Sequence, residues 1–258
     1  MASLISFFIL LSTFSLFLSN VAGGLIGVNY GRIANNLPPP AKVVELLKTQ
    51  GINQVKLYDT EASVLKALSG SNNIMAYYPS TQIIAIAVGN EVFVDPNNTT
   101  DFLVPAMKNV QAALLSNKLD STIKISSPIA LGCLQNSYPS SAGSFKPELT
   151  ESVIKSMLDL IRQTGSHLMV NAYPFFAYES NSDVISLDYA LFRENPGVVD
   201  SGNALKYFSL VEAQLDAVYA AMSALKYDDI KIVVSETGWP SKGNVRVREC
   251  FSLLLRTN

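Results

Sequence analysis

The sequence predicts an α/β fold in which helices cover a parallel β-sheet. Its candidate strands are apolar runs without polar alternation, as in strands that are buried on both faces. Most of them are followed by a segment with apolar residues at helical spacing. A closed barrel and an open doubly wound sheet both satisfy this pattern. In either fold, chemistry lies where strands end and loops begin.

The first third of the chain alternates between predicted strands and helices. The helix at 38–51 is opened by prolines and stopped by Gly51, and a shorter helix follows the second strand at 60–70. The predicted strands are residues 25–31, 54–59 and 82–91.

The rest of the chain continues the same alternation. Helices are predicted at 104–119, 151–165 and 209–227, and strands at 122–130, 167–176 and 231–236. The predicted core faces of the last two helices are Ile154, Met157, Leu158 and Ile161, and then Val211, Leu215, Val218, Met222 and Leu225. Two long connections, 132–150 and 179–209, contain prolines and aromatic residues, which predicts ordered walls.

Composition favours one large domain with a neutral partner. The chain has 258 residues, of which 48% are hydrophobic and 16% charged, and its net charge is −2. No run of Lys or Arg suggests nucleic acid or an anionic membrane. The first predicted strand runs into GVNYGR rather than a G-x-G-x-x-G loop, which argues against a nucleotide-dependent oxidoreductase.

The first residues are typical of a secretory signal peptide, predicted over 1–23. An apolar stretch ends in the small residues Val21, Ala22 and Gly23. The alternative is a membrane anchor, but the stretch is shorter than the about 20 apolar residues that span a bilayer. We therefore expect a secreted protein, extracellular or in the cell wall, that has no membrane attachment after cleavage.

Two further features of the sequence are relevant to a secreted protein, because glycosylation and disulfide formation take place in the secretory pathway. Asn97 and Asn98 both begin N-glycosylation triplets in a polar loop. The chain has two cysteines, Cys133 and Cys250, which could pair in an oxidising compartment, although sequence alone does not reveal connectivity.

Two glutamates end predicted strands that lie far apart in the chain. Glu91 follows the apolar run 83–88, and Glu236 follows the run 232–234. At the ends of parallel strands in one barrel, their carboxylates would face the same mouth. Cleavage of a glycosidic bond requires such a pair, about 5 Å apart for retention and about 6.5–9.5 Å for inversion. The simpler alternative is that each glutamate caps the next helix or contacts solvent.

Other residues near these strand ends suit a sugar. Asn90 could bind a sugar hydroxyl or cap the strand, and Trp239, the only tryptophan, could stack on a sugar ring or pack in the core. At the predicted end of the fifth strand we expect Tyr173 to be the strongest binding candidate, with Asn171, Phe175 and Phe176 beside it; the two phenylalanines suit wall packing equally well.

Two other kinds of site are not expected. No His, Cys and Asp residues have metal-ligand spacing, so the sequence predicts neither a metal nor another cofactor. His167 is the only histidine and starts a strand, which argues against a Ser-His-Asp triad.

Several motifs resemble the plant glucan endo-1,3-beta-glucosidases of glycoside hydrolase family seventeen. They are IGVNYGRIANNLP, VKLYD, IAVGNEVF, VNAYPFFAY, ISLDYALF and VVSETGWPSKG, within residues 26–243. The resemblance implies a TIM-type (β/α)8 barrel, secretion, and retaining internal cleavage of β-1,3-glucan by a monomer. Glu91 matches the acid/base of the family and Glu236 its nucleophile, while Tyr30 and Tyr58 match its first two strand ends.

The resemblance also indicates where this chain departs from the family. Between Ser69 and Gln82, about 30 residues of a third strand and its helix are missing, about one strand–helix unit. The family pattern stops after Gly243, so the eighth unit is absent and 244–258 form an atypical tail. The expected domain is therefore an incomplete barrel of about six units over 24–243. It is either an active glucanase or an inactive member with residual glucan binding or no function.

Overall fold

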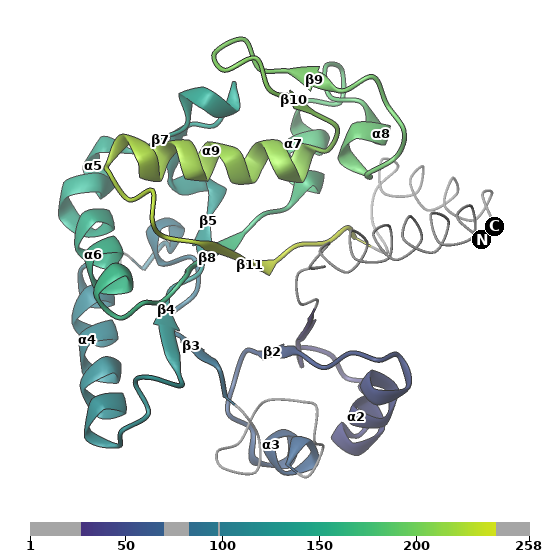
Figure 1. The fold of residues 1–258 in the computed structure, drawn as a ribbon. Coiled ribbons are helices and arrows are strands. Elements are labelled where there is room, and N and C mark those ends of the chain that lie inside the picture. The colour runs from purple at the N-terminus through teal and green to yellow at the C-terminus, as the bar shows by residue number, and fades with distance from the viewer. Residues whose placement is uncertain (1–26, 70–82, 98, 241–258) are drawn as a thin grey trace, which may run out of the picture. The chain divides into compact units, whose positions relative to one another are not determined.

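The structure is a computed structural model that describes residues 27–69, 83–97 and 99–240 (Figure 1). The chain divides into two compact units, residues 1–82 and 83–258, and each is described by itself. Several predictions lie outside the described residues: the signal peptide 1–23, the gap between Ser69 and Gln82, Asn98, Cys250 and the tail 244–258.

The described part of the first unit contains two strand–helix pairs. Its elements are β1 (Val28–Tyr30), α2 (Pro40–Thr49), β2 (Val55–Leu57) and α3 (Ala62–Leu68), as the sequence predicts. Strands β1 and β2 are parallel, with Val28 opposite Val55. The two helices share a small core of Val44, Leu47, Val64 and Leu68. Helix α2 stops before Gly51, whose φ of 68° glycine adopts without strain.

The second unit contains the larger share of the described elements. Its helices are α4 (Thr100–Ser116), α5 (Pro147–Leu149), α6 (Lys155–Gln163), α7 (Pro174–Ser180), α8 (Leu187–Ala190) and α9 (Leu210–Ala224). Its strands are β3 (Ala85–Ala87), β4 (Lys124–Ser126), β5 (Ile129–Ala130), β6 (Leu134–Asn136), β7 (Ser144–Phe145), β8 (Leu168–Asn171), β9 (Val198–Val199), β10 (Lys206–Tyr207) and β11 (Ile232–Glu236).

The parallel strands of this unit follow one another in chain order. Strand β3 pairs with β4, β5 pairs with β8, and β8 pairs with β11 (Figure 1). The predicted strand at 122–130 is split into β4 and β5 at Pro128, which has no N–H for a ladder. The hydroxyl of Ser126 accepts a hydrogen bond of 3.0 Å from the Met169 N–H and thus links β4 to β8. The ends of β3, β8 and β11 therefore lie at one edge.

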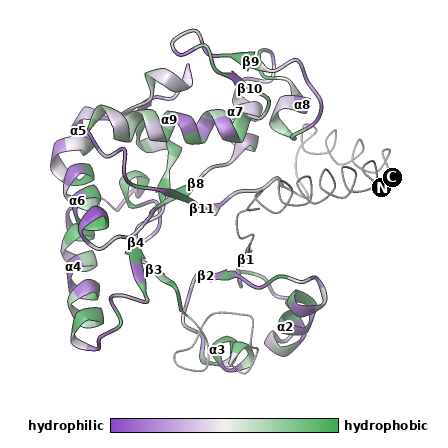
Figure 2. Cartoon of the chain, viewed as in Figure 1, coloured by the Kyte–Doolittle hydropathy of each residue, from purple (hydrophilic) through white to green (hydrophobic). Residues whose placement is uncertain are grey.

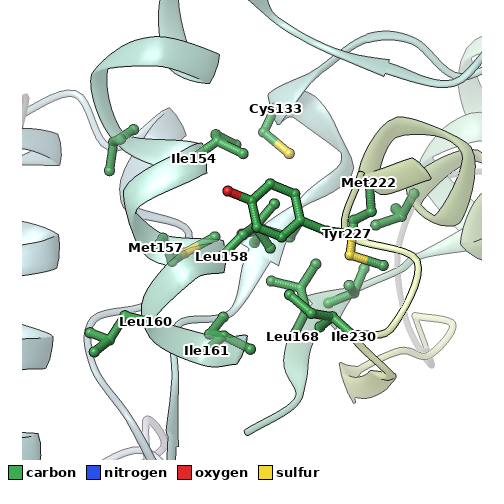
Figure 3. Packing of buried hydrophobic residues seen from close by; sticks show 14 of the residues in the cluster. Cys133, Ile154, Met157, Leu158, Leu160, Ile161, Leu168, Met222, Tyr227 and Ile230 are labelled. Atoms are coloured by element: carbon green, nitrogen blue, oxygen red, sulfur yellow. The ribbon is translucent and has the colours of Figure 1, made fainter. Parts of the chain in front are cut away.

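Helix α6 shows why these segments fold as they do. The predicted face, Ile154, Met157, Leu158 and Ile161, is fully buried in the core of the second unit (Figure 3). Burial of each side chain contributes about 1.5–3 kcal/mol. Figure 2 shows that α4, α6 and α9 each carry both hydrophilic and hydrophobic residues. This is typical of a helix that packs one face on a core and exposes the other to solvent.

Two further predicted elements differ in detail. The predicted helix at 151–165 begins with a π-helical turn, Thr150–Ile154. The fifth strand is shorter than predicted, because β8 ends at Asn171 and Pro174 starts α7. The prediction that Phe175 and Phe176 close a strand is therefore wrong: proline is favourable in the first turn of a helix and cannot donate to a β-ladder.

The last predicted strand is also less buried than its apolar sequence suggests. In β11, Val233 is 43% exposed and Val234 is 38% exposed. Within the described residues, β11 is the end strand of the order β11–β8–β5, so its ladder has a neighbour on one side. An apolar run predicts burial on both faces only if other elements of the fold cover both faces of that strand.

Candidate active site

Glu91 has an unusual backbone conformation just after β3. Its φ of 53° and ψ of 35° are left-handed, which costs a non-glycine residue about 1–2 kcal/mol. Its backbone N–H donates a hydrogen bond of 2.9 Å to the carbonyl of Pro128, which anchors this turn to the connection between β4 and β5. Strained residues of this kind cluster at functional sites.

Glu236 is the last residue of β11 and is buried, with 8% of its surface exposed. A β-bulge precedes it: Val234 pairs with Val170, and Glu236 pairs with the next residue of β8, Asn171. Ser235 is the additional residue. In a regular strand, adjacent side chains point to opposite faces, whereas a bulge changes their direction. Both Ser235 and Glu236 therefore contact the end of β8.

Asn171 connects the surroundings of the two glutamates. Its side-chain Nδ2 donates a hydrogen bond of 2.7 Å to Oε1 of Glu91 and one of 3.3 Å to Oδ1 of Asn90. Its Oδ1 accepts a hydrogen bond of 2.6 Å from the hydroxyl of Ser235. Asn171 itself is buried, at 2% exposure. The structure thus brings together Glu91, Asn90, Asn171 and the end of β11.

Tyr173 extends this network to the second carboxylate. Its hydroxyl donates a hydrogen bond of 2.9 Å to Oε2 of Glu236. The backbone N–H of Ala172 donates to the carbonyl of Glu236 at 2.9 Å. Asn171, the last residue of β8, and the two residues that follow it therefore contact both glutamates. This arrangement can hold two carboxylates close to one reacting bond.

The aromatic residues near this strand end form one chain of ring contacts. Trp239 packs edge-on against Phe175, with ring centres 5.1 Å apart, and lies 5.7 Å from Tyr178. Phe176 contacts both Tyr173 and Phe175 edge-on and is 60% exposed. An exposed aromatic ring beside a buried cluster can cover an apolar sugar face.

The remaining predicted residues are each described within their own unit. Tyr30 ends β1 and Tyr58 follows β2, in the first unit, so a role in binding glucan stays a prediction for both. The glycosylation candidate Asn97 is exposed, and its Nδ2 donates to Asp95. Cys133 is a free, buried thiol, and burial raises its pKa to about 12.

The described residues lack two kinds of feature. Within residues 27–69, 83–97 and 99–240, no three His, Cys, Asp or Glu side chains are grouped so that they could hold a metal ion. In the same part of the chain, no helix has the length and apolar character needed to cross a membrane.

Ser235 is the residue that sequence reasoning missed. It stands directly before Glu236 in a strand, so simple alternation predicts that their side chains point in opposite directions. The bulge that changes its direction depends on pairing with β8, more than 60 positions earlier in the chain, as the separation of 64 between Ser235 and Asn171 shows. The one available signal was its place next to a candidate nucleophile.

Comparison with known proteins shows the family of this chain. The profile of the family described as Glycosyl hydrolases family 17 matches residues 26–75 and 71–251. The protein named Glucan endo-1,3-beta-glucosidase 10 from Arabidopsis thaliana is 42% identical over 249 residues, covering 85% of this chain and 58% of the relative. This chain spans about half the length of the curated relatives it matches.

Two solved structures are also similar. One is CJP38, described as a beta-1,3-glucanase and allergen of Cryptomeria japonica pollen, with 39% identity and a TM-score of 0.80 over 86% of this chain and 77% of that one. The other comes from work on two plant beta-glucan endohydrolases and has 33% identity and a TM-score of 0.78 over 86% of this chain and 79% of that one. Both support the TIM-type (β/α)8 barrel as the fold of this protein. On this family match and these similarities, the chain belongs to the family Glycosyl hydrolases family 17.

Proposed function

We propose that this chain cleaves internal β-1,3-glucosidic bonds of β-1,3-glucans, with Glu91 as acid/base and Glu236 as nucleophile. The observation that carries the proposal is that residues 171–173 hydrogen-bond to both carboxylates: Asn171 to Glu91 at 2.7 Å and Tyr173 to Glu236 at 2.9 Å. The names of the relatives and structural neighbours support the choice of substrate.

The reaction proceeds in two displacements. Glu91 protonates the glycosidic oxygen while a carboxylate oxygen of Glu236 attacks the anomeric carbon, which forms a glycosyl–enzyme ester and releases the reducing-end fragment. Glu91, now ionised, takes a proton from water as that water attacks the same carbon and frees Glu236. Two inversions at one carbon give retention. The Tyr173 hydroxyl holds Oε2 of Glu236 during the attack.

Glucan binding is assigned to polar and aromatic groups around these carboxylates. We propose that Asn90 contacts a hydroxyl next to the scissile bond and that Phe176 and Trp239 provide apolar surface for sugar rings. Tyr30 and Tyr58, which match the first two strand ends of the family, are also proposed to contact sugar. A neutral polymer suits a chain with a net charge of only −2.

The mechanism is tested with laminarin, a soluble β-1,3-glucan, and the variants Glu91→Gln and Glu236→Gln. Each is expected to lower kcat by at least about 10³-fold, because each removes a group that acts in the transition state. Azide, a small anion, should rescue Glu91→Ala on 2,4-dinitrophenyl β-laminaribioside, whose leaving group needs no proton, and yield a β-glycosyl azide, since it attacks the intact glycosyl–enzyme. With Glu236→Ala and an activated glucosyl fluoride, it should yield the α-azide.

The alternative of an inactive glucan-binding member makes a different prediction. It requires that laminarin in the gel slows the migration of the wild-type chain in affinity electrophoresis, while the chain releases no reducing ends from laminarin. A wild-type chain that is folded by circular dichroism and neither binds nor cleaves laminarin would contradict both assignments.

We also propose that the chain lacks one internal strand–helix unit. The two segments of the family match meet at residues 71–75. In addition, 85% of the 258 residues is about 219, so about 30 of the 249 positions aligned with the Arabidopsis protein have no counterpart here. This number equals about one strand–helix unit. Such a chain keeps its catalytic residues in a barrel with fewer units.

Secretion, a monomeric state and N-glycosylation at Asn97 or Asn98 complete the proposal. The exposure of Asn97 supports access by the glycosylation machinery. Expression in plant cells, followed by enzymatic removal of N-glycans, should lower the mass of the secreted chain. The shift should disappear in the Asn97→Gln/Asn98→Gln variant, and size-exclusion chromatography should give the mass of one chain.

A further inference from the structure

The hydrogen bonds of Asn171 leave its side-chain amide with defined partners at both ends. The Nδ2 group has two hydrogens, and it contacts two acceptors, Oε1 of Glu91 and Oδ1 of Asn90. The Oδ1 atom accepts from Ser235 at 2.6 Å. A flipped amide would place its oxygen against the Glu91 carboxylate, where two acceptors would repel each other. The orientation of Asn171 is therefore tied to Ser235 on one side and Glu91 on the other.

We propose that Ser235 is a positioning residue for Glu91, acting through the amide of Asn171. This inference rests on the proposed role of Glu91 as acid/base. The Ser235 hydroxyl holds Oδ1, which directs Nδ2 toward Oε1 of Glu91 and fixes the rotation of that carboxylate. The bulge in β11 makes this possible, because it turns Ser235 toward Asn171.

The chemical consequence concerns the proton of the acid. A carbonyl-type oxygen accepts a hydrogen bond better than the hydroxyl oxygen of a carboxylic acid. Because Oε1 accepts from Asn171, the protonated form of Glu91 carries its proton on Oε2. Ser235 and Asn171 thus determine which oxygen of Glu91 donates to the departing sugar.

The geometry also explains why these residues act together. Asn171 is 2% exposed, so its amide is shielded from competing water. A buried amide that loses one partner keeps the desolvation cost of the unsatisfied atom and can rotate to find another. Loss of the Ser235 hydroxyl therefore disturbs Glu91 although the serine contacts neither Glu91 nor the reacting bond in our proposal.

The test compares two substrates of the full chain. Laminarin has a poor leaving group that needs protonation, whereas 2,4-dinitrophenyl β-laminaribioside expels 2,4-dinitrophenolate, which leaves without a proton. Ser235→Ala should lower kcat on laminarin by about 10-fold to 100-fold with KM nearly unchanged, since a displacement near 1 Å costs about 10²-fold. It should lower the rate of the bond-cleaving step on the aryl substrate by less than about threefold.

Three controls isolate the route through Asn171. Ser235→Thr keeps the hydroxyl and should restore most of the activity. Ser152→Ala removes an exposed helix hydroxyl and should not change either rate. The double variant Ser235→Ala/Asn171→Ala should match Asn171→Ala alone, because Ser235 has nothing left to position.

A spectroscopic readout separates this inference from the proposed function. The side-chain NH₂ resonances of Asn171, assigned from Asn171→Ala, should shift and exchange faster in Ser235→Ala even if the wild-type chain turns out to be inactive. Equal losses on both substrates, additive losses in the double variant, or unchanged NH₂ resonances would overturn the positioning role. Absence of turnover in the wild-type chain, with the resonance change present, would overturn only the glucanase assignment.

Discussion

Glu91 combines a candidate catalytic side chain with a backbone conformation that favours glycine. Its φ of 53° follows Gly89, whose φ is 70°, so the chain after β3 makes a tight left-handed turn. This turn directs the carboxylate toward Asn171, which donates to it at 2.7 Å. Active sites commonly keep such strain because it fixes the direction of a functional group.

The strain can be measured with two variants that lack the same side chain. We expect Glu91→Gly to be more stable than Glu91→Ala by about 1 kcal/mol, because glycine adopts positive φ without a clash of Cβ. The measurement is the free energy of unfolding in urea, with both variants inactive on laminarin. Equal stabilities, or a more stable alanine variant, would mean that the turn is not strained by its side chain.

The long connections of the second unit are held by contacts between short elements. Asp200, next to β9, accepts hydrogen bonds from both the backbone N–H and the hydroxyl of Ser141, at 2.7 and 2.6 Å. It also accepts from the N–H of Gly202 at 2.8 Å. The hydrogen bonds from Ser141 are the main reason why the pKa of Asp200 lies below its usual 3.8. One carboxylate thus joins the connections 132–150 and 179–209.

This joint predicts a pH dependence with a definite sign. A carboxyl group whose pKa is lower in the folded state stabilises the fold above its unfolded pKa, near 3.8, and that stability is lost as the pH falls through the folded value. We therefore expect Asp200→Asn to be less stable than the wild type at pH 6, with a difference that shrinks below about pH 3.8. Urea unfolding from pH 6 to pH 2.5 checks this, and a pH-independent difference would contradict it.

The connection 132–150 also packs very closely against α9. A Cβ placed on Gly143 would lie 2.0 Å from the carbonyl oxygen of Ala217, so Gly143→Ala must displace backbone. We expect a loss of about 1–3 kcal/mol in the free energy of unfolding. Gly31→Ala is the matched control, because a Cβ there meets no atom within 4 Å, and it should change stability by less than about 0.5 kcal/mol.

At the scale of the whole molecule, the core of the second unit protects a cysteine. Cys133 is 0% exposed beside α6, and burial raises the pKa of its thiol to about 12 (Figure 3). The thiolate is the reactive form. In a Cys250→Ser variant at pH 8, we expect iodoacetamide to label Cys133 only after urea unfolds the unit, as mass spectrometry would show. Rapid labelling of the native chain would show that this core opens locally.

The proposed internal gap gives a second prediction at this scale. Inserting the corresponding segment of about 30 residues from the Arabidopsis relative after Ser69 should raise both the melting temperature and kcat on laminarin, because barrel closure sets where the strand ends point. A Gly/Ser linker of equal length is the control and should do neither. If the two insertions behave alike, the gap has no effect on the site.

Much of the architecture follows from local patterns. The order of strands and helices, the buried face of α6 and the position of Glu236 at the end of β11 agree with the structure, because apolar periodicity acts over a few residues. Glu91 was predicted to end a strand, but β3 ends at Ala87 and Glu91 lies in the turn that follows. Pro174 was present in the sequence as a helix-start signal, but the apolar residues around it favoured a longer strand. The family motifs around Glu91 and Glu236 were likewise sufficient to predict the family.

The contacts between segments that are distant in the sequence are seen only in the tertiary structure. The bulge before Glu236, the role of Ser235 and the exposure of Val233 depend on how β11 pairs with β8. The contact of Asn171 with Glu91 joins residues 80 positions apart. Hydrophobic periodicity specifies which face of an element is apolar, whereas hydrogen-bond register is set by its neighbours. The residue types at individual strand ends can therefore be predicted from the sequence, whereas the orientation of these ends relative to one another depends on the tertiary structure.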